Sequence, residues 1–296
     1  MKDFESYLTE RVKLVNDKLN ELLPLPDLKP EVLFQAMRYS VFAGGKRLRP
    51  VLFLAAVEAV GEDSESLLPF ACALELIHTY SLIHDDLPAM DNDDFRRGLP
   101  TCHKKYGEAQ AILAGDSLLT YAFNLMLKLR ENKVMPERLL EAIDEVAFGA
   151  GVKGMIVGQV VDIEAENREI SLEELKFIHR YKTGALFRAA IRSGAILAGA
   201  KKTQLVALTG YAEQFGLAFQ ITDDILDVIG DEKKLGKPVG SDANNKKATY
   251  PALIGLEKAK IQASEAVERA IKSLDIFNST ADPLREIAKL VITREN

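Results

Sequence analysis

The chain has 296 residues, of which 47% are hydrophobic, so it can form a substantial buried core and is not an intrinsically disordered chain. The net charge of −6 and the sequence pI near 5.5 argue against a general nucleic-acid binder, because phosphate backbones are held by a surplus of Lys and Arg over a whole face. Cys72 and Cys102 are the only cysteines, so we expect no disulfide framework, and a reducing cytoplasm fits.

The N-terminal stretch, MKDFESYLTERVKLVNDKL, alternates charged and apolar residues at helical spacing. It lacks the uninterrupted apolar core of a signal peptide, and no apolar run approaches the roughly 20 residues that span a bilayer. We therefore expect a soluble, cytoplasmic protein with no membrane span.

Residues 44–50, GGKRLRP, place Lys46, Arg47 and Arg49 directly after two glycines. Further candidate cations are Arg96, Arg97, Lys182 and Lys237. In an acidic protein these residues are either scattered surface charge or clamps for phosphate, which Arg binds through paired hydrogen bonds and Lys as a point charge.

Residues 81–98, SLIHDDLPAMDNDDFRRG, carry five aspartates between an apolar run and an arginine pair. Close carboxylates repel one another, so this spacing predicts a positive partner among them. The helical pattern before them ends at Asp85. His78 lies seven residues earlier, within about 20° of Asp85 on a helical wheel and roughly 10 Å along the axis, so one helix face could reach both an anion and a metal. Taken alone, His78 would be an ordinary buried imidazole.

Two glycine-containing segments resemble nucleotide-binding motifs, but neither meets the full requirements of its motif. GAGVKG at 149–154 matches G-x-G-x-x-G, yet a helical pattern precedes it instead of a strand, which favours a helix kink or close helix packing. GDEKKLGK at 230–237 has one residue too many between its glycines for a P-loop, and no Ser or Thr follows Lys237.

The following segments read as helices. SLEE at 171–174 is a capping box, with Ser171 placed to cap the helix and Glu174 to reach back. Apolar residues at helical spacing mark a stripe at Leu205, Leu208, Tyr211, Phe215 and Phe219. Since we find no sustained period-two alternation and no linker rich in Gly, Ser or Pro, the sequence predicts one all-α domain over residues 1–296.

A second acidic group, DDILD at 223–227, puts Asp223 and Asp227 on one helix face, about 6 Å apart along the axis. Alone, it would be a solvated helix surface. Both acidic groups, however, are embedded in apolar sequence, where unpaired carboxylates cost several kcal/mol. Carboxylate oxygens without a soft ligand nearby select a hard cation such as magnesium, which completes its shell with water and substrate phosphate.

Five ordered segments resemble the motifs of the bacterial trans-prenyl diphosphate synthases, and most closely those of the farnesyl diphosphate synthase branch. They are GGKRLRP, HTYSLIHDDLPAMDNDDFRRGLPTCH, GQVVD, HRYKTGALFRAA and FQITDDILD. The resemblance implies a single-domain helical bundle of the isoprenoid synthase type around a central cavity, usually as a homodimer. The one departure is Val157, where the family has a glycine.

The resemblance also implies an activity. The protein would condense isopentenyl diphosphate with dimethylallyl and geranyl diphosphate to give farnesyl diphosphate, by magnesium-assisted ionisation of the allylic diphosphate and addition to the carbocation. The implied metal ligands are Asp85, Asp91 and Asp223, and the carboxylates that orient bound water are Asp86, Asp224 and Asp227. The implied contacts to isopentenyl diphosphate are Lys46, Arg49, His78 and Arg97, and those to the allylic diphosphate are Arg96, Lys182 and Lys237. The Lys182 carbonyl, Thr183 and Gln220 would steady the carbocation.

Two local features fit this chemistry. Thr183 and Gly184 interrupt a helical pattern, which is where a free carbonyl can arise. Residues 230–247 would close as a lid that excludes water from the carbocation.

Product length depends on the residues just before Asp85. Tyr80 lies about 7.5 Å back along the helix and Ser81 about 6 Å back. The family has an aromatic residue at the position of Tyr80 in its farnesyl branch, so Tyr80 would block growth beyond three isoprene units, while the small Ser81 leaves room for the second addition. Alternatively, Tyr80 is an interfacial core aromatic.

Three other functions stay open. One is a geranylgeranyl diphosphate synthase of the same family. A terpene cyclase ionises similar substrates, but its second metal motif usually mixes Asn, Ser or Thr with Glu. A non-catalytic partner subunit of a heteromeric synthase tends to lose the aspartates and basic residues that are present here.

Overall fold

The computed structural model describes residues 2–131, 134–229 and 248–293. Nearly all of its regular structure is helical, which confirms the all-α prediction. The chain divides into two compact units. Unit 1 comprises Met1–Leu54 and Ser64–Leu139, and unit 2 comprises Ala55–Asp63 and Leu140–Asn296. The single domain over residues 1–296 and its central cavity stay predictions.

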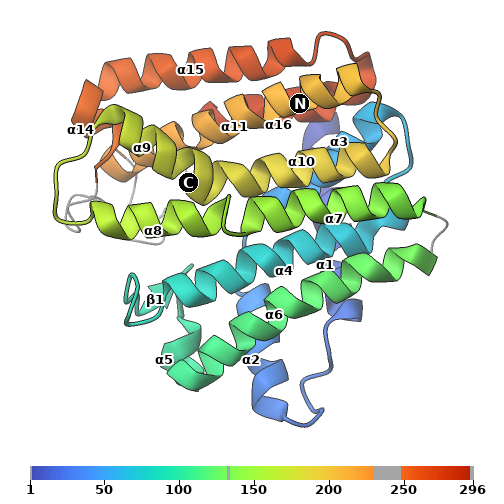
Figure 1. Ribbon diagram of the computed structural model, residues 1–296, viewed down its shortest axis with the longest axis vertical. Coiled ribbons are helices and arrows are strands. Elements are labelled where there is room, and N and C mark those ends of the chain that lie inside the picture. Colours follow the sequence, from blue (N-terminus) through green and yellow to red (C-terminus); the bar gives the residue numbers. More distant parts are fainter. Residues whose placement is uncertain (1, 132–133, 230–247, 294–296) are drawn as a thin grey trace. The chain divides into compact units, whose positions relative to one another are not determined.

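Unit 1 is built from helices and one small hairpin (Figure 1). Its helices are α1 (Lys2–Leu22), α2 (Glu31–Phe42), α4 (Leu68–Asp85), α5 (Cys102–Tyr106) and α6 (Glu108–Lys128), with the short turns η1 (Glu65–Leu67) and η2 (Leu129–Glu131). Two helices belong to both units, α3 (Leu48–Val60) and α7 (Pro136–Ala150).

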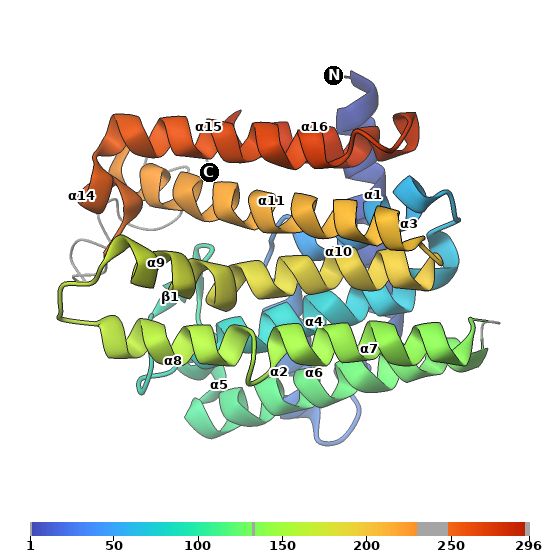
Figure 2. The ribbon, with the colours of Figure 1, turned by 45° about the horizontal axis from the view of Figure 1, so that its top comes forward.

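The core of unit 1 forms where α4 packs along α6 (Figures 1 and 2). Residues 70–77 of α4 are all buried, and α6 presents Ala114, Leu118 and Ala122 at four-residue intervals. Full burial of a large apolar side chain contributes about 1.5–3 kcal/mol. Because small residues alternate with Leu on this face of α6, the two helices can approach closely.

An ion pair ties the GGKRLRP segment to this core. The Arg47 guanidinium lies 2.7 Å from Glu75 on α4, with both side chains 3% exposed, and it also donates to the carbonyl of Val41. Removing one partner of such a buried pair costs about 3–5 kcal/mol. Arg47 is therefore part of the scaffold, although the sequence groups it with Lys46 and Arg49.

A two-stranded hairpin follows the first acidic group, with β1 (Phe95–Arg96) antiparallel to β2 (Leu99–Pro100). Arg97 and Gly98 form its tight turn, both with positive φ. The sequence analysis did not predict it, because strands of two residues are too short to show alternation.

All regular secondary structure in the described residues of unit 2 is helical. Its elements are α8 (Met155–Ala165), α9 (Leu172–Ile178), η3 (His179–Gly184), α10 (Ala185–Leu197), α11 (Lys202–Ile229), α14 (Tyr250–Ile254), α15 (Leu256–Ser273), η4 (Ser279–Ala281) and α16 (Asp282–Thr293). In both ribbon views α11 runs between α10 and α15 (Figures 1 and 2).

Helix α11 is the central element of unit 2. Leu208, Tyr211 and Phe215 of its predicted apolar stripe are fully buried, and the Phe215 ring meets Phe187 of α10 edge to face at 5.2 Å. The Tyr211 hydroxyl donates a 2.7 Å hydrogen bond to the carbonyl of Leu284 on α16. The helix that carries the second acidic group is thereby fixed on two sides.

The predicted helix start at Ser171 is confirmed in part. The Ser171 hydroxyl accepts from the Glu174 amide at 3.2 Å. The Glu174 carboxylate does not complete the box but pairs with Arg168. The capping box therefore has only one of its two hydrogen bonds, the one from the Glu174 amide to the Ser171 hydroxyl.

The GAGVKG segment is a break between two helices, as expected. Helix α7 ends at Ala150 and α8 begins at Met155, and the two run end to end (Figure 1). A Cβ at Gly149 would lie 2.6 Å from the Cβ of Ala189, so Gly149 allows α7 and α10 to pack closely. Helix α7, and not a strand, directly precedes the segment, which excludes the dinucleotide interpretation.

Two helical stretches, Glu65–Asp85 and Pro136–Ala165, are long and apolar enough to cross a bilayer by length and composition, where the sequence analysis expected none. A buried core helix meets the same criterion, and the first stretch is 67% buried. The second contains the break at 151–154. The finding is weak evidence for a span.

Candidate active site

The predicted site residues fall into two groups, one in each unit. Unit 1 holds Lys46, Arg49, His78, Tyr80, Ser81, Asp85, Asp86, Asp91, Arg96 and Arg97, and unit 2 holds Lys182, Thr183, Gln220, Asp223, Asp224 and Asp227. Lys237 and the predicted lid at 230–247 lie outside the described residues.

Asp85 and Asp91 lie side by side at the end of α4. Helix α4 ends at Asp85, as predicted, and the chain then turns back so that the Asp91 amide donates a 2.9 Å hydrogen bond to the Asp85 carbonyl. Both residues are half-buried. A single turn thus returns the backbone to the end of α4 six positions after Asp85.

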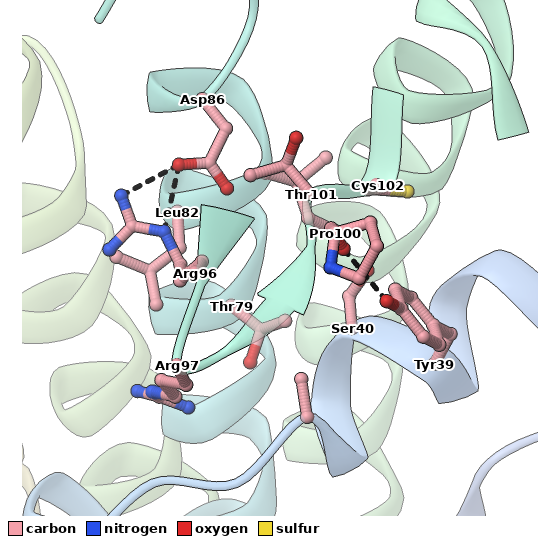
Figure 3. Close-up of a pocket in the computed structure, with 12 residues that line it drawn as sticks. Tyr39, Ser40, Thr79, Leu82, Asp86, Arg96, Arg97, Pro100, Thr101 and Cys102 are labelled. Carbon is pink, nitrogen blue, oxygen red and sulfur yellow. Dashed lines mark hydrogen bonds and ion pairs between the residues drawn. The ribbon is translucent and has the colours of Figure 1, made fainter. Parts of the chain in front are cut away.

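Asp86 has a different environment. It is buried and pairs with Arg96, whose Nε and Nη2 atoms lie 2.8 and 2.7 Å from Oδ1 of Asp86 (Figure 3). Burial raises the pKa of Asp86, and the Arg96 guanidinium opposes that shift. Two residues assigned to separate tasks by resemblance are therefore bonded to each other.

A pocket opens beside this pair, lined by α2, α4 and the hairpin (Figure 3). Arg96, Arg97, Asp86 and Thr79 contribute polar groups to its wall. The Tyr39 hydroxyl donates a 2.7 Å hydrogen bond to the Pro100 carbonyl and so fastens the hairpin to α2. The pocket can thus offer guanidinium groups to an anion from a fixed hairpin.

The cations of this region gather around His78. Burial lowers the pKa of His78 well below its usual value, and the charges of Arg49 and Arg97 lower it further. Burial, opposed by Glu75 and reinforced by Arg97, lowers the pKa of Arg49 to about 10. Neighbouring groups that disfavour one another's protonated forms mark a place with a surplus of positive charge, which a bound anion would relieve.

Two glycines bring the backbone against Arg97. Gly44 and Gly45 have φ of +100° and +117°, which L side chains rarely adopt, and Arg97 Nη1 donates to the Gly44 carbonyl. A Cβ at Gly45 would lie 2.5 Å from Arg97 Nη1. The glycine pair is needed both for the turn and for the place of the guanidinium.

Tyr80 and Ser81 lie on α4 below Asp85. The Tyr80 side chain is 7% exposed, and burial, with the nearby charge of Asp85, raises its pKa to about 12. The Tyr80 ring meets the His84 ring edge to face at 5.7 Å. The Ser81 hydroxyl donates to the His78 carbonyl at 2.9 Å. Tyr80 is thus neutral, buried and near Asp85, and its role as a cavity floor stays a prediction.

In unit 2 the predicted helix interruption is a π-helical turn, η3, which contains Lys182 and Thr183. A π turn displaces carbonyls from their usual partners and often marks a functional site. Lys182 Nζ lies 2.6 Å from Asp162 on α8. A Cβ on Gly158 would overlap the Lys182 backbone, so the missing side chain of Gly158 lets α8 approach η3 closely. The branched Val157 lies next to this glycine in the sequence and does not prevent the approach.

Asp224 holds two other segments of unit 2. Its Oδ2 accepts a 2.8 Å hydrogen bond from the Tyr250 amide, and its Oδ1 lies 3.7 Å from His179 Nε2. The His179 and Tyr250 rings stack at 5.6 Å. Burial, opposed by Asp162 and reinforced by Lys182, lowers the pKa of His179 to about 4. His179 is therefore neutral at pH 7, and the Asp224 carboxylate lies beside an uncharged imidazole.

The remaining residues of α11 differ in exposure. Asp223 is exposed, whereas Asp227 and Gln220 are buried. The predicted i, i+4 spacing of Asp223 and Asp227 holds on a continuous helix.

Comparison with known proteins decides the family. Residues 30–286 match the polyprenyl synthetase family. The chain belongs to the polyprenyl synthetase family. It is accordingly a prenyltransferase.

Among its relatives in that family, the farnesyl diphosphate synthase of Geobacillus stearothermophilus is 48% identical over 99% of this chain and 98% of its own length. The geranylgeranyl diphosphate synthase of Cyanophora paradoxa is also 48% identical, over 98% of this chain and 96% of its own. The crystal structure of geranylgeranyl pyrophosphate synthetase from Pyrococcus horikoshii Ot3 superposes with a TM-score of 0.90 at 33% identity, covering 99% of both chains.

The carboxylates fit the metal that polyprenyl synthetases are expected to use. In the described residues no three His, Cys, Asp or Glu side chains form a group that could hold an ion by themselves. Magnesium does not need such a cage, because it usually binds one or two carboxylates and takes its other oxygens from water and substrate phosphate. Asp85 and Asp91, whose backbones meet at the end of α4, would supply such carboxylates.

Two functional partners escaped the sequence analysis. Asp162 pairs with Lys182, and its signal was the GQVVD segment, which was matched to the family without a role for its aspartate. Tyr250, whose amide binds Asp224, lies outside every motif that was singled out. Neither contact follows from helical periodicity, since the partners are 20 and 26 residues apart.

Proposed function

We propose that the protein condenses isopentenyl diphosphate with dimethylallyl diphosphate and then with geranyl diphosphate to give farnesyl diphosphate. The observation that carries this proposal is the cationic cluster of His78, Arg49 and Arg97, which belongs to the same unit as Asp85 and Asp91. One group of residues suits a diphosphate alone and the other suits a diphosphate with a metal.

Isopentenyl diphosphate would bind at the cationic cluster. The charges of Arg49 and Arg97 lower the pKa of His78, which supports a shared anion site, and the exposed Lys46 precedes Arg49 by three positions. Guanidinium groups bind diphosphate oxygens through paired hydrogen bonds, and His78 would donate one more. The hairpin and the two glycines would keep Arg97 in place, which limits the entropy lost on binding.

The allylic diphosphate would be held by Arg96 and Lys182 in their respective units and by Lys237. Asp86 orients the Arg96 guanidinium and Asp162 orients the Lys182 ammonium, and each cation has donors left for phosphate oxygens. Asp85, Asp91 and Asp223 would hold Mg²⁺, with Asp86, Asp224 and Asp227 arranging water. When bound, Mg²⁺ supplies charge neutralisation of the leaving diphosphate.

The reaction then needs no side-chain base. The C–O bond between the allylic C1 and its diphosphate breaks, the isopentenyl double bond forms a C–C bond to C1, and the released diphosphate takes the proton from the isopentenyl C2. The Lys182 carbonyl in the π turn, Thr183 and Gln220 would steady the allylic cation with polar atoms that do not capture it.

A farnesyl product is supported by Tyr80, a large buried side chain five positions before Asp85. Geranylgeranyl diphosphate is the second candidate product, because the relative from Cyanophora paradoxa bears that name at the same identity as the farnesyl diphosphate synthase. The two products form by the same chemistry. They differ in the length of the cavity that the growing hydrocarbon chain requires.

The test uses the purified full chain with labelled isopentenyl diphosphate, magnesium and each allylic starter in turn, followed by chromatography of the dephosphorylated products. We expect farnesol as the main alcohol. Geranylgeraniol as the main alcohol would support the second candidate. Absence of any condensation product would overturn the proposal.

A homodimer and a cytoplasmic location belong to the same proposal. Exposed apolar side chains on α7 and α8, including Phe148, Ile156 and Val160, would be covered by a second copy. Both cysteines are free and buried, which fits a reducing compartment. Light scattering should give twice the chain mass, and Val160→Glu should shift the protein toward the monomer. A monomeric wild type would exclude the dimer.

A further inference from the structure

Gly115 on helix α6 lies against His84, whose ring contacts Tyr80, the predicted floor of the cavity. Gly115 is buried on α6, and a Cβ built on it would overlap the His84 ring, with Cδ2 at 2.6 Å and Cε1 at 3.0 Å. The imidazole therefore occupies the space that any other residue at position 115 would fill. This contact lies wholly within unit 1.

The His84 ring is held in that position by α6. Its Nε2 atom lies 3.2 Å from the Ile112 carbonyl, one turn before Gly115, and 4.0 Å from the Asp116 carboxylate. A hydrogen bond from Nε2–H to the carbonyl fixes both the tautomer and the plane of the ring. Moving the ring away from α6 would break this bond.

The His84 ring also contacts the Tyr80 ring. The two rings meet edge to face with centroids 5.7 Å apart and an interplanar angle of 83°. His84 and Tyr80 are four positions apart on α4, so they lie on one helix face. The chain of contacts runs from Gly115 to His84 and from His84 to Tyr80.

We propose that Gly115 is a specificity-determining positioning residue, because its missing side chain lets His84 dock on α6 and hold the Tyr80 ring where it limits product length. This inference rests on the proposed function. It assigns the control of chain length to α6 as well as to α4. His84 and Gly115 need not touch the substrate, since they act through Tyr80.

The experiment is a double-mutant cycle with Gly115→Ala, His84→Ala and both together, in the full chain under the assay above. Each single variant should raise the ratio of products longer than farnesyl diphosphate roughly two- to tenfold, as expected for loss of one edge-to-face contact. The double variant should match His84→Ala, since no ring remains to be displaced. The ratio of products, measured at equal conversion, is a readout that a general loss of stability does not move.

Two controls complete the design. Gly210→Ala on α11 introduces a Cβ 3.1 Å from the Ser273 hydroxyl, far along the chain from α4 and α6, and should leave the product ratio unchanged. Tyr80→Ala reports whether the floor itself is correctly identified. If Gly115→Ala does not fold, the double variant should recover folded protein, because the overlap is gone.

Several outcomes would overturn the inference. Unchanged product ratios in Gly115→Ala and His84→Ala, together with longer products from Tyr80→Ala, would show that α6 does not position the floor. Additive effects in the cycle, or a double variant that stays unfolded when His84→Ala folds, would also refute it. A wild type that makes no condensation product would instead refute the proposed function.

Discussion

The Tyr250 amide donates a 2.8 Å hydrogen bond to Asp224 Oδ2, so the acidic group of α11 holds the first residue of α14. The stacking of Tyr250 on His179 extends this link to the first residue of the π turn that carries Lys182. Asp224 therefore anchors α14 and the π turn, in addition to its proposed role of orienting bound water.

The first prediction separates these two roles. Asp224→Ala leaves the buried Tyr250 amide without its acceptor and should lower the free energy of unfolding by about 1–3 kcal/mol. Asp224→Asn keeps an oxygen acceptor and should stay within about 1 kcal/mol of the wild type. Urea unfolding measures the stability and kcat/KM the activity. Equal destabilisation by both variants would contradict the anchoring role.

Metal dependence is the second prediction. Excess chelator should abolish turnover, and added Mg²⁺ should restore it. Asp85→Ala should lower kcat by several orders of magnitude, because the loss of a metal ligand removes stabilisation of the charge that develops in the transition state. Asp275→Asn, an exposed aspartate after α15, is the matched control and should keep normal activity. Near-normal turnover in chelator would refute the metal requirement.

Arg97 and Gly45 form the third prediction. Arg97→Ala should raise KM for isopentenyl diphosphate about ten- to hundredfold and KM for the allylic substrate much less, because a charge-assisted contact is lost. Gly45→Ala should act in the same direction by displacing the guanidinium. Gly61→Ala is its control, since Gly61 has a similar φ of +107° with nothing within 4 Å. Equal changes in both Michaelis constants would show that Arg97 does not discriminate between the substrates.

The fourth prediction concerns product length. Tyr80→Ala should shift the main product to geranylgeranyl diphosphate or longer chains, whereas Ser81→Phe should stop synthesis near geranyl diphosphate. Tyr80→Phe keeps the ring and should leave the product unchanged. Chromatography of the alcohols is the measurement. A Tyr80→Ala variant that is less stable but still makes only farnesyl diphosphate would identify Tyr80 as a core aromatic.

The fifth prediction is a pH dependence of stability. His179 has a native pKa of about 4 against an unfolded value of 6.5, so below pH 6.5 the unfolded chain binds a proton that the native protein excludes. Stability should fall as the pH drops from 6.5 toward 4, by about 2 kcal/mol at pH 5 from this group alone. His179→Phe keeps an aromatic ring beside Tyr250 and should lose that part of the slope in urea unfolding at pH 5 to 7. Parallel slopes for the two proteins would contradict the assignment.

Much of this organisation could be predicted from local sequence. The helix end at Asp85, the Ser171 cap and the interruption at Thr183 each depend on residues within one or two turns, and each was found where the pattern placed it. The contacts between distant segments could not be predicted in this way. Arg47 was grouped with the candidate phosphate ligands because nothing near it in the sequence reveals Glu75. Gly115 was not singled out, because its neighbour His84 is on another helix.

The contact between Arg97 and the Gly44 carbonyl offers a spectroscopic reporter. A substrate anion that draws the Arg97 guanidinium toward itself changes the hydrogen bond at that carbonyl, and the peptide bond it belongs to carries the Gly45 amide. The Gly45 ¹⁵N resonance should therefore move on titration with isopentenyl diphosphate alone. Occupancy of that subsite could then be followed by nuclear magnetic resonance without turnover and without any probe attached to the protein.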